Sequence, residues 1–367
     1  MRVLHVINSL ILAGAEALTK ELALECKRHG VDVSVAVLKR LDNAFEDELF
    51  RAGVPLISLS STGIYSPLHI LPLARKISDY DVVQATLFPA TLWTICATRI
   101  YRRVPIITTS EQSTHNRRRT PCLRPFDRWL YPQFDAIPCA SRAIESSLLE
   151  WVPAVADRTL VIPNAIPLEK FRGATPARKE EIIGTKAPVA IFVARFENSK
   201  DHTTLLRAVT GIIGLHLVLV GDGPLRPAAE ALAQSLNIAQ RVHFIGRRSD
   251  VPALLKMADV YVQCSTWEGF GIAAVEAMAA GLPVIATDVP GLAEVIGDSG
   301  ILFERGDVGA LQRHLNAVLS DAGLRHRLIT SGQQRAEEFS IQRTAALYLE
   351  TYERLIQEKS AAGSARR

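Results

Sequence analysis

The sequence has little of what disulfide frameworks, zinc sites and membrane spans require. Its five cysteines are scattered along 367 residues with no close pairing, which is typical of a reducing compartment and argues against a disulfide framework or a cysteine-rich zinc site. No uninterrupted apolar run reaches the roughly 18 residues that cross a bilayer. We expect no signal peptide, because a strand is predicted directly at residues 2–8. These absences predict a cytoplasmic protein that can still touch a membrane surface.

Metal-binding patterns are also scarce. The one Asp-x-Asp, at residues 79–81, falls between a predicted helix end and the start of a strand, which is the edge of a parallel sheet where ligands do not bind. No histidine spacing is typical of zinc, and the predicted strand positions of His5 and His216 favour packing roles. We therefore expect no bound metal and no other cofactor.

Charge is weakly positive overall and uneven along the chain. The formal charge of +4 is too small to indicate nucleic acid as a partner. Within Arg99–Arg128, eight arginines face only Glu111 and Asp127, so this segment carries +6 and the rest of the chain −2. Such a patch suits an anionic membrane surface or a diphosphate-bearing acceptor, although it can equally be a solvated loop. The arginines are Arg99, Arg102, Arg103, Arg117, Arg118, Arg119, Arg124 and Arg128.

Length and hydrophobic pattern predict two α/β domains. A chain of 367 residues exceeds the usual size of one domain. Short apolar runs alternate with helical patterns in the first half, and the alternation restarts at residue 189, which indicates two parallel sheets covered on both faces. We predict domains at 1–165 and 188–340, joined by an irregular linker rich in proline and glycine at 166–187. With two such domains facing each other, we expect a ligand site in the cleft between them.

The stretch Glu268–Gly281 has the pattern of a strand, a glycine turn and a helix. It follows a predicted buried strand at 258–264, places Gly269 and Gly271 in the turn, and continues as a small-residue helix. This geometry presents backbone N–H groups and the positive end of a helix to an anion. Glu276 lies eight positions after the first carboxylate, so the two can address different parts of one ligand. Taken alone, the turn can also be an ordinary strand-to-helix connection.

Several segments together carry a resemblance to a known family. In order, they are Ala13–Glu16, Val161–Ala165, Val193–His202, Leu219–Pro224, Glu268–Ala279 and Gly281–Thr287. Their order and spacing resemble the retaining GT-B glycosyltransferases of family 4, over nearly the whole chain, with specific motifs in the second half and diffuse ones in the first. The resemblance implies an α/β GT-B fold of two doubly wound, Rossmann-like domains facing a central cleft. It also implies that a helix at 341–360 crosses back to the first domain.

The resemblance implies transfer of a sugar from a nucleotide-diphosphate donor, with the anomeric configuration kept and no metal. Arg195 and Lys200 match residues that bind the donor diphosphate, where arginine chelates phosphate and lysine acts as a point charge. Glu276 matches the carboxylate that binds the ribose hydroxyls. The turn of Glu268, Gly269, Phe270 and Gly271 matches a segment placed against the transferred hexose, and its glycines permit close backbone approach. We assign Glu268 a catalytic, electrostatic role, not that of a covalent nucleophile.

The first domain departs from the family pattern. Gly14, with Glu16 behind it, lets the loop after the first strand approach the diphosphate. In the polar loop after a later strand, Gln112 stands where the family often has a histidine, beside Glu111, and His115 is three residues too late to replace it. We expect Glu111 to contribute to catalysis, while the identity of the first-domain partner stays open.

These observations predict a hexosyltransferase that uses a UDP- or GDP-sugar. The expected acceptor is a saccharide or a polyprenyl-diphosphate-linked saccharide of surface-polysaccharide synthesis, with the Arg99–Arg128 segment resting on the inner membrane face. Three alternatives stay open: the same fold acting on a soluble small-molecule acceptor, a GT-B sugar-nucleotide epimerase, and a silent nucleotide-sugar-binding subunit. The intact set of Arg195, Lys200, Glu268 and Glu276 argues against the last of these.

Overall fold

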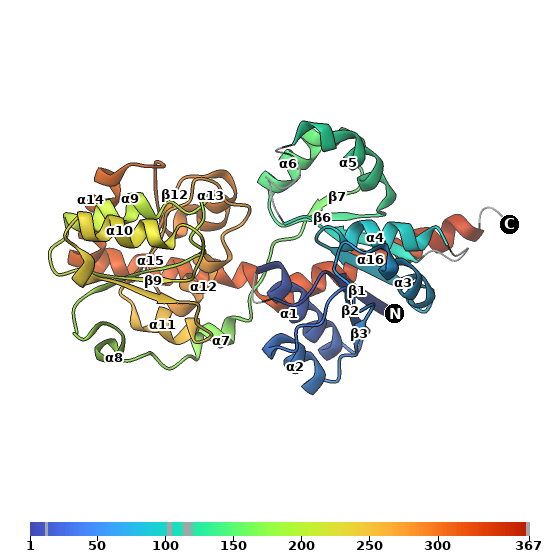
Figure 1. The fold of residues 1–367 in the computed structure, drawn as a ribbon, viewed down its shortest axis with the longest axis horizontal. Helices are drawn as coiled ribbons and strands as arrows, with labels where there is room; N and C mark the ends of the chain where they lie inside the picture. Colours follow the sequence, from blue (N-terminus) through green and yellow to red (C-terminus); the bar gives the residue numbers. More distant parts are fainter. Residues whose placement is uncertain (12–13, 101–104, 113–117, 119, 365–367) are drawn as a thin grey trace. The chain divides into compact units, whose positions relative to one another are not determined.

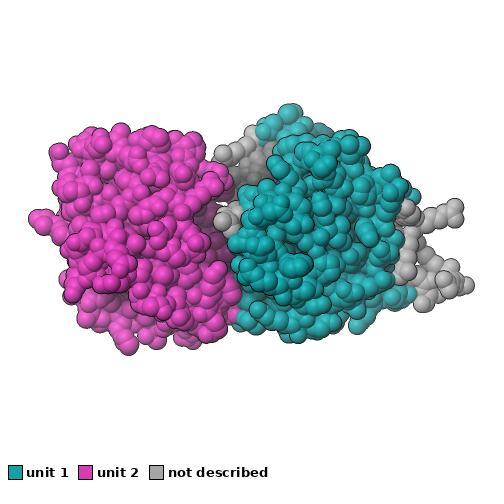
Figure 2. Space-filling model, turned by 60° about the horizontal axis from the view of Figure 1, so that its bottom comes forward, with its two compact units in different colours: residues 1–165, 341–367 teal, residues 166–340 magenta. Residues whose placement is uncertain are grey.

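The computed structural model describes residues 1–11, 14–100, 105–112, 118, 120–364 of the chain (Figure 1). They form two compact units, coloured separately in Figure 2. Unit 1 comprises Met1–Ala165 and Ile341–Arg367, and unit 2 comprises Ile166–Ser340. Across the described ranges, no helix combines the length and apolarity that crossing a membrane needs.

Unit 1 is built on a parallel sheet with the strand order β3-β2-β1-β4-β5. The strands are β1 (Arg2–Ile7), β2 (Asp32–Val37), β3 (Leu56–Ser58), β4 (Val82–Thr86) and β5 (Ile106–Ser110). A short parallel pair, β6 (Ile137–Cys139) and β7 (Thr159–Val161), continues from β5 through the isolated bridges Thr108–Ala136 and Glu111–Cys139. Strands β1 and β4 are buried almost throughout, as their apolar runs predict for a sheet with two covered faces.

The helices of unit 1 follow its strands in alternation (Figure 1). They are α1 (Gly14–Arg28), α2 (Ala44–Arg51), α3 (Ile70–Ile77), α4 (Ala90–Thr98), α5 (Arg124–Leu130), α6 (Arg142–Trp151) and α16 (Ile341–Ser364), with short 3₁₀ turns at η1 (Pro67–His69), η3 (Pro121–Leu123), η4 (Tyr131–Gln133) and η5 (Pro153–Val155). Side-chain caps begin α2 and α6: Asn43 accepts from the N–H groups of Phe45 and Glu46, and Ser141 accepts from the N–H of Ile144.

Helix α16 lies in unit 1 although it follows unit 2 in the sequence. Ile341, Ala345, Tyr348 and Tyr352 recur at spacings of three and four and are buried in the core beside α1. The Tyr348 hydroxyl lies 3.1 Å from Ser110 Oγ, and the Tyr352 hydroxyl donates to Gln84 Oε1 on β4. These contacts fix the helix that was expected to return to the first domain.

Unit 2 repeats the architecture with six parallel strands in the order β10-β9-β8-β11-β12-β13. The strands are β8 (Val189–Val193), β9 (His216–Val220), β10 (Val242–Gly246), β11 (Val260–Gln263), β12 (Val284–Thr287) and β13 (Ile301–Phe303). The helices are α7 (Leu168–Arg172), α8 (Lys179–Ile183), α9 (His202–Thr210), α10 (Arg226–Ser235), α11 (Val251–Met257), α12 (Ile272–Ala280), α13 (Pro290–Ile296), α14 (Val308–Ser320) and α15 (Ala322–Ala336), with 3₁₀ turns at η6 (Ala239–Arg241), η7 (Gly297–Ser299) and η8 (Glu337–Phe339).

Residues 166–187 are not the irregular linker that their composition predicted. They carry α7 and α8 and belong to unit 2. Leu168 and Phe171 are buried, and α7 packs against α11 and α12. Helices of five residues are too short to show a hydrophobic period, which is why proline and glycine dominated the prediction.

Both sheets change direction at their first strand. In unit 1 the chain goes from β1 to β2 and β3 on one side, and then to β4 and β5 on the other. In unit 2, β8 plays the part of β1, with β9 on one side and β11 on the other. Ligands of open parallel sheets bind outside the carboxyl ends of the strands at such a switch point, which directs attention to the loops after β1, β4, β8 and β11.

Candidate active site

Two glycines fix the loop that carries Arg195. A Cβ on Gly221 would lie 2.0 Å from the carbonyl oxygen of Ala194, and one on Gly223 would lie 2.5 Å from that of Phe196. Gly221 also has φ of +135°, a conformation that side chains other than glycine rarely adopt. The loop after β9 therefore packs directly behind the loop after β8, and larger residues at these two glycines would push Arg195 out of place.

The two predicted phosphate-binding cations have different surroundings. The Arg195 side chain is 66% exposed and pairs with Glu197 Oε1 at 2.6 Å. The Lys200 side chain is only 18% exposed, and its ammonium pairs with Glu268. Lys200 is placed by an isolated backbone bridge to Ser265 and by its carbonyl oxygen, which lies 2.9 Å from His202 Nδ1. The structure thus joins Lys200 to Glu268 and leaves the Arg195 guanidinium largely in solvent.

Glu268 is held by three donors. Its Oε2 accepts from Lys200 Nζ, from Gln263 Nε2 at 2.9 Å and from Ser265 Oγ at 3.5 Å. The hydroxyl of Tyr261, fully buried on β11, donates to Gln263 Oε1 at 3.0 Å. Burial, together with the charges of the two nearby glutamates, raises the pKa of the Tyr261 hydroxyl well above its usual value, so it stays a donor. Gln263 and Tyr261 were not among the predicted site residues, although a glutamine at the end of an apolar strand is a visible signal.

The glycine turn is seated against the start of α13. Gly271, the N-cap of α12, has φ of +91° and leaves room for Leu292, whose Cδ1 would be 2.5 Å from an added Cβ. Gly291 allows the approach from the other side, since its Cβ would lie 2.5 Å from the carbonyl oxygen of Glu268 and 2.4 Å from that of Gly269. Phe270 is buried edge-on against Phe339 at 5.3 Å. Because a glycine N-cap has no side chain, the first N–H groups of α12 receive no side-chain cap from it.

Glu276 lies one and a half turns into α12 and is half-buried. Burial raises the pKa of its carboxyl to about 7, against the lowering influence of Lys170 on α7. Within the described part of the chain, no residue forms a hydrogen bond or an ion pair with this carboxyl. A carboxyl in this state is available to accept hydrogen bonds from a ligand's hydroxyl groups. Lys170 was not predicted, because α7 was taken for linker.

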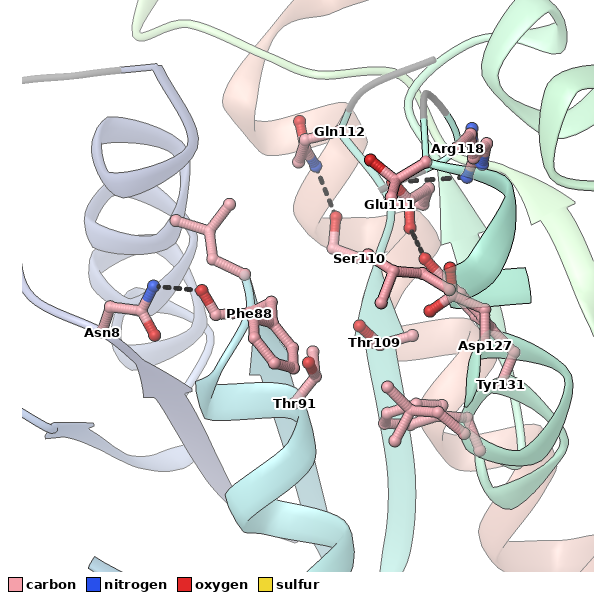
Figure 3. Close-up of a pocket in the computed structure, with 15 residues that line it drawn as sticks. Asn8, Phe88, Thr91, Thr109, Ser110, Glu111, Gln112, Arg118, Asp127 and Tyr131 are labelled. Atoms are coloured by element: carbon pink, nitrogen blue, oxygen red, sulfur yellow. Dashed lines mark hydrogen bonds and ion pairs between the residues drawn. The ribbon is translucent and has the colours of Figure 1, made fainter. Parts of the chain in front are cut away.

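A cavity of about 530 Å³ opens within unit 1 at the carboxyl ends of β1, β4 and β5 (Figure 3). One wall carries Asn8 and Phe88, where Asn8 Nδ2 donates to the Phe88 carbonyl oxygen at 2.9 Å across the switch point. The opposite wall carries Ser110, Glu111 and Tyr131. The lining residues are Asn8, Leu87, Phe88, Thr91, Thr109, Ser110, Glu111, Gln112, Arg118, Thr120, Leu123, Asp127, Leu130, Tyr131 and Phe134.

Glu111 lies in this pocket with both carboxylate oxygens engaged. Its Oε2 accepts from the Tyr131 hydroxyl, and its Oε1 lies 3.5 Å from Arg118 Nη2. Its own N–H donates to the carbonyl oxygen of Pro138 at 2.8 Å, which ties the end of β5 to β6. Glu111 is therefore an ordered part of the wall, in contact with partners that sequence analysis did not foresee.

The residue at the expected histidine position also holds the pocket wall. Gln112 Nε2 donates to Ser110 Oγ, which in turn lies 3.1 Å from the Tyr348 hydroxyl of α16. Gly14 begins α1, with Glu16 buried in the first turn. His115 lies outside the described residues.

The Arg99–Arg128 segment is not a uniform cationic surface. The Arg118 side chain is only 9% exposed and binds Glu111 and Ser147. Arg124 stacks on Trp151 at 5.3 Å and donates to two backbone carbonyl oxygens, and Arg99 donates to Gln133. Arg102, Arg103, Arg117 and Arg119 lie outside the described residues. A charge count cannot tell an inward-facing arginine from a solvated one.

Two histidines and the Asp-x-Asp have structural settings. His5 is fully buried in β1, and burial lowers its pKa to about 4. His216 is half-buried and stacks on His243 with their ring nitrogens 2.9 Å apart. Asp81 accepts from the N–H of Arg2 at 2.7 Å. Over the described ranges, no group of three or more potential ligands could hold a metal ion.

Comparisons with known proteins agree with this architecture. A family model described as Glycosyltransferase Family 4 matches residues 12–170, and one described as Glycosyl transferases group 1 matches residues 174–335. The chain is 30% identical over 240 residues to N-acetyl-alpha-D-glucosaminyl L-malate synthase of Bacillus anthracis, covering 63% of each chain. It is 32% identical over 167 residues to the lipopolysaccharide core biosynthesis glycosyltransferase LpsE of Rhizobium meliloti, covering 45% of this chain and 49% of the relative. The matches thus span less than two-thirds of these relatives' lengths.

Among solved structures, Anabaena HepE in complex with UDP and glucose superposes with a TM-score of 0.85, at 20% identity, over 96% of this chain and 99% of that one. The likeness shows that the two parallel-sheet units are the two Rossmann-like domains of the GT-B fold. The two family models divide the chain between them, one on residues 12–170 and the other on 174–335. The chain belongs to the family 4, or group 1, glycosyltransferases of the GT-B fold.

Proposed function

We propose that this glycosyltransferase moves a hexose from a UDP- or GDP-sugar to a saccharide or lipid-linked saccharide of a surface glycan, with retention and without a metal. The observation that carries the proposal is the Lys200–Glu268 pair beside the uncapped start of α12. It places a cation, a carboxylate and a helix N-terminus together at the switch point of unit 2. The UDP and glucose bound to HepE support this choice of donor.

The leaving group determines what the donor site must do. When the glycosidic bond breaks, negative charge grows on the departing diphosphate, and fixed positive groups lower the barrier where that charge develops. Lys200, already positioned by its backbone bridge, and the N–H groups at the start of α12 supply such groups. Arg195 is exposed and, among the described residues, its side chain pairs with Glu197 at the surface, so it can turn toward a phosphate at small cost.

The two glutamates take different parts of the donor. Glu268, held by Gln263 and Ser265, is directed at the hexose hydroxyls and the developing positive charge at the anomeric carbon. Glu276 binds the ribose hydroxyls. Its half-buried carboxyl has no hydrogen-bond donor among the described residues, and the ribose hydroxyls supply these donors. For Gly14 we propose the donor-binding role that the family resemblance implies.

The unit 1 pocket takes the acceptor. Its hydroxyl and amide side chains, among them Thr91, Ser110 and Gln112, suit a ligand rich in hydroxyl groups, and Phe88 offers an apolar face for a sugar ring. Because Tyr131 and Arg118 engage both oxygens of Glu111, we propose that Glu111 supports catalysis by fixing the wall on which the acceptor rests.

A soluble small-molecule acceptor is the second candidate. The name of the Bacillus anthracis relative, a glucosaminyl L-malate synthase, describes such an acceptor, and the buried Arg118 of the pocket could bind its carboxylate. Offering purified enzyme and donor either L-malate and related acids or a polyprenyl-diphosphate saccharide separates the two. A sugar-nucleotide epimerase would instead convert the donor alone.

A thermal-shift screen over UDP-, GDP-, ADP- and TDP-sugars tests the proposal first. A ligand bound by the folded state at 100 times its Kd adds about 2.7 kcal/mol to the free energy of unfolding, so the matching donor raises Tm by several degrees. Lys200→Ala should abolish most of that rise, whereas Lys256→Ala, a change on α11 of the same unit, should keep it. An equal rise in the wild type and Lys200→Ala would refute the diphosphate assignment.

A further inference from the structure

We propose that unit 1 docks on an anionic lipid surface through a face made by Tyr65, in the turn before η1, together with η1, α3 and α5, here called the Tyr65–Trp129 face. Its residues are Tyr65, Leu68, Leu71, Arg75, Lys76, Arg128 and Trp129. The docking does not depend on the proposed reaction. Only the purpose of docking, which is access to a lipid-linked acceptor, rests on the proposed function. The face differs from the Arg99–Arg128 patch because its apolar side chains come mainly from residues 65–71, outside that segment.

Four large apolar side chains of these segments are exposed. The exposed fractions are 68% for Tyr65, 64% for Leu68, 48% for Leu71 and 44% for Trp129. A line of ring contacts joins the two ends: Tyr65 to Phe88 at 6.4 Å, Phe88 to Phe126 at 6.0 Å and Phe126 to Trp129 at 5.9 Å. Single exposed apolar residues are ordinary, but a contiguous group marks a binding surface.

The helical part of the face, η1 and α3, carries apolar side chains on its exposed side as well as on its buried side. His69, Leu73, Ala74 and Ile77 are buried on the inner side of η1 and α3. On the outer side, Leu68, Leu71 and Arg75 follow one another at spacings of three and four, so they share one stripe. Two leucines are followed by two cations, Arg75 and Lys76, all exposed. Apolar and basic residues side by side on the solvent face are typical of helices that lie at a membrane interface.

Charge selects lipid over protein as the partner. The sequence has no Asp or Glu between residues 59 and 78, and within the described chain no acidic residue pairs with Arg75, Lys76 or Arg128. Protein interfaces are depleted in lysine, whereas lysine, arginine and interfacial aromatic residues together match anionic headgroups above an acyl layer.

The face adjoins the proposed acceptor pocket. Phe88 belongs both to the line of rings and to the pocket wall. An acceptor whose lipid stays in the bilayer could therefore place its saccharide in the pocket without leaving the membrane. This continuity gives the docking surface a function.

Vesicle co-sedimentation tests the proposal with the full chain. Phosphatidylcholine vesicles with and without phosphatidylglycerol are the probes, and the expected result is binding that needs the anionic lipid and weakens with salt. Each cation at the surface contributes about a fivefold change in affinity, so the double variant Arg75→Gln/Lys76→Gln should bind about 25-fold more weakly. Leu68→Ser/Leu71→Ser should lose binding by at least about tenfold.

The chain offers matched controls. Phe50→Ser on α2 of unit 1 and Ile213→Ser in unit 2 remove apolar side chains that are 81% and 99% exposed, and both should bind vesicles like the wild type. Equal losses in these controls, or wild-type binding no stronger than to pure phosphatidylcholine, would overturn the proposal. Unchanged Tm values confirm that each variant folds. Nucleotide-sugar binding is measured in parallel and should be unaffected, so a failure of the donor assignment is distinguishable from a failure of docking.

Discussion

The relay from Tyr261 through Gln263 to Glu268 gives the sharpest prediction. Gln263 is 2% exposed and connects the Tyr261 hydroxyl, at 3.0 Å, to the Glu268 carboxylate, at 2.9 Å. Gln263→Leu removes a hydrogen bond to a charged group, worth about 1.5–3 kcal/mol, and removes the oxygen that accepts the proton of the buried Tyr261 hydroxyl, at a cost of about 1–3 kcal/mol. Transfer should fall by about tenfold or more, and Tm should fall as well.

A second substitution separates the two effects. In Tyr261→Phe/Gln263→Leu neither partner of the lost hydrogen bond remains, and such paired replacements are nearly neutral for stability. Tm should therefore recover, while transfer stays low because Glu268 still lacks the hydrogen bond from Gln263. The measurements are kcat, KM and Tm for the wild type and three variants, including Tyr261→Phe. If transfer recovers together with Tm, the relay only stabilises the fold and the reasoning is wrong.

Three further predictions concern the donor side. Lys200→Ala removes a charge where the leaving diphosphate develops and should lower transfer by about 100-fold or more, measured as kcat/KM beside Lys256→Ala. The pKa of Glu276 is raised to about 7 in the folded protein, so ionisation of this carboxyl opposes folding. The free energy of unfolding is unaffected below the pKa of the unfolded carboxyl, and it falls as the pH rises from there through about 7. The free energy of unfolding, measured in urea, should therefore decline from pH 5 to 8 in the wild type and decline less in Glu276→Gln. Donor affinity should rise over the same pH range in the wild type but not in Glu276→Gln. Gly291→Ala, whose Cβ would meet the Glu268 carbonyl oxygen at 2.5 Å, should cost about 1–3 kcal/mol and weaken donor binding, whereas Gly63→Ala, with open space around it, should do neither. Equal effects in each pair would contradict the assigned contacts.

The two parallel sheets, and the strand, glycine turn and helix around Gly271, were predicted correctly because they depend on local patterns. Alternating apolar runs specify strands and helices, and the glycines at 269 and 271 stand within a few residues of the glutamate that they position.

Contacts between distant parts of the chain could not be predicted. Gly291 accommodates a turn twenty residues earlier, Lys170 faces Glu276 from a helix taken for linker, and Arg118 turns inward to Glu111. Each depends on tertiary packing that one sequence does not display. The same holds for the Tyr65–Trp129 face, whose two ends meet only through the rings of Phe88 and Phe126.

The central claim, sugar transfer with retention at the Lys200–Glu268 site, is tested most directly by proton NMR of donor turnover. The donor identified by thermal shift is incubated with wild type and with Lys200→Ala, with and without acceptor, and the first-formed sugar product is observed before its anomers equilibrate. Retaining transfer at this site should release nucleotide diphosphate and a product with the donor's anomeric configuration, far faster from the wild type than from Lys200→Ala. An inverted product, an intact nucleotide bearing a changed sugar, or equal turnover by the two proteins would contradict it.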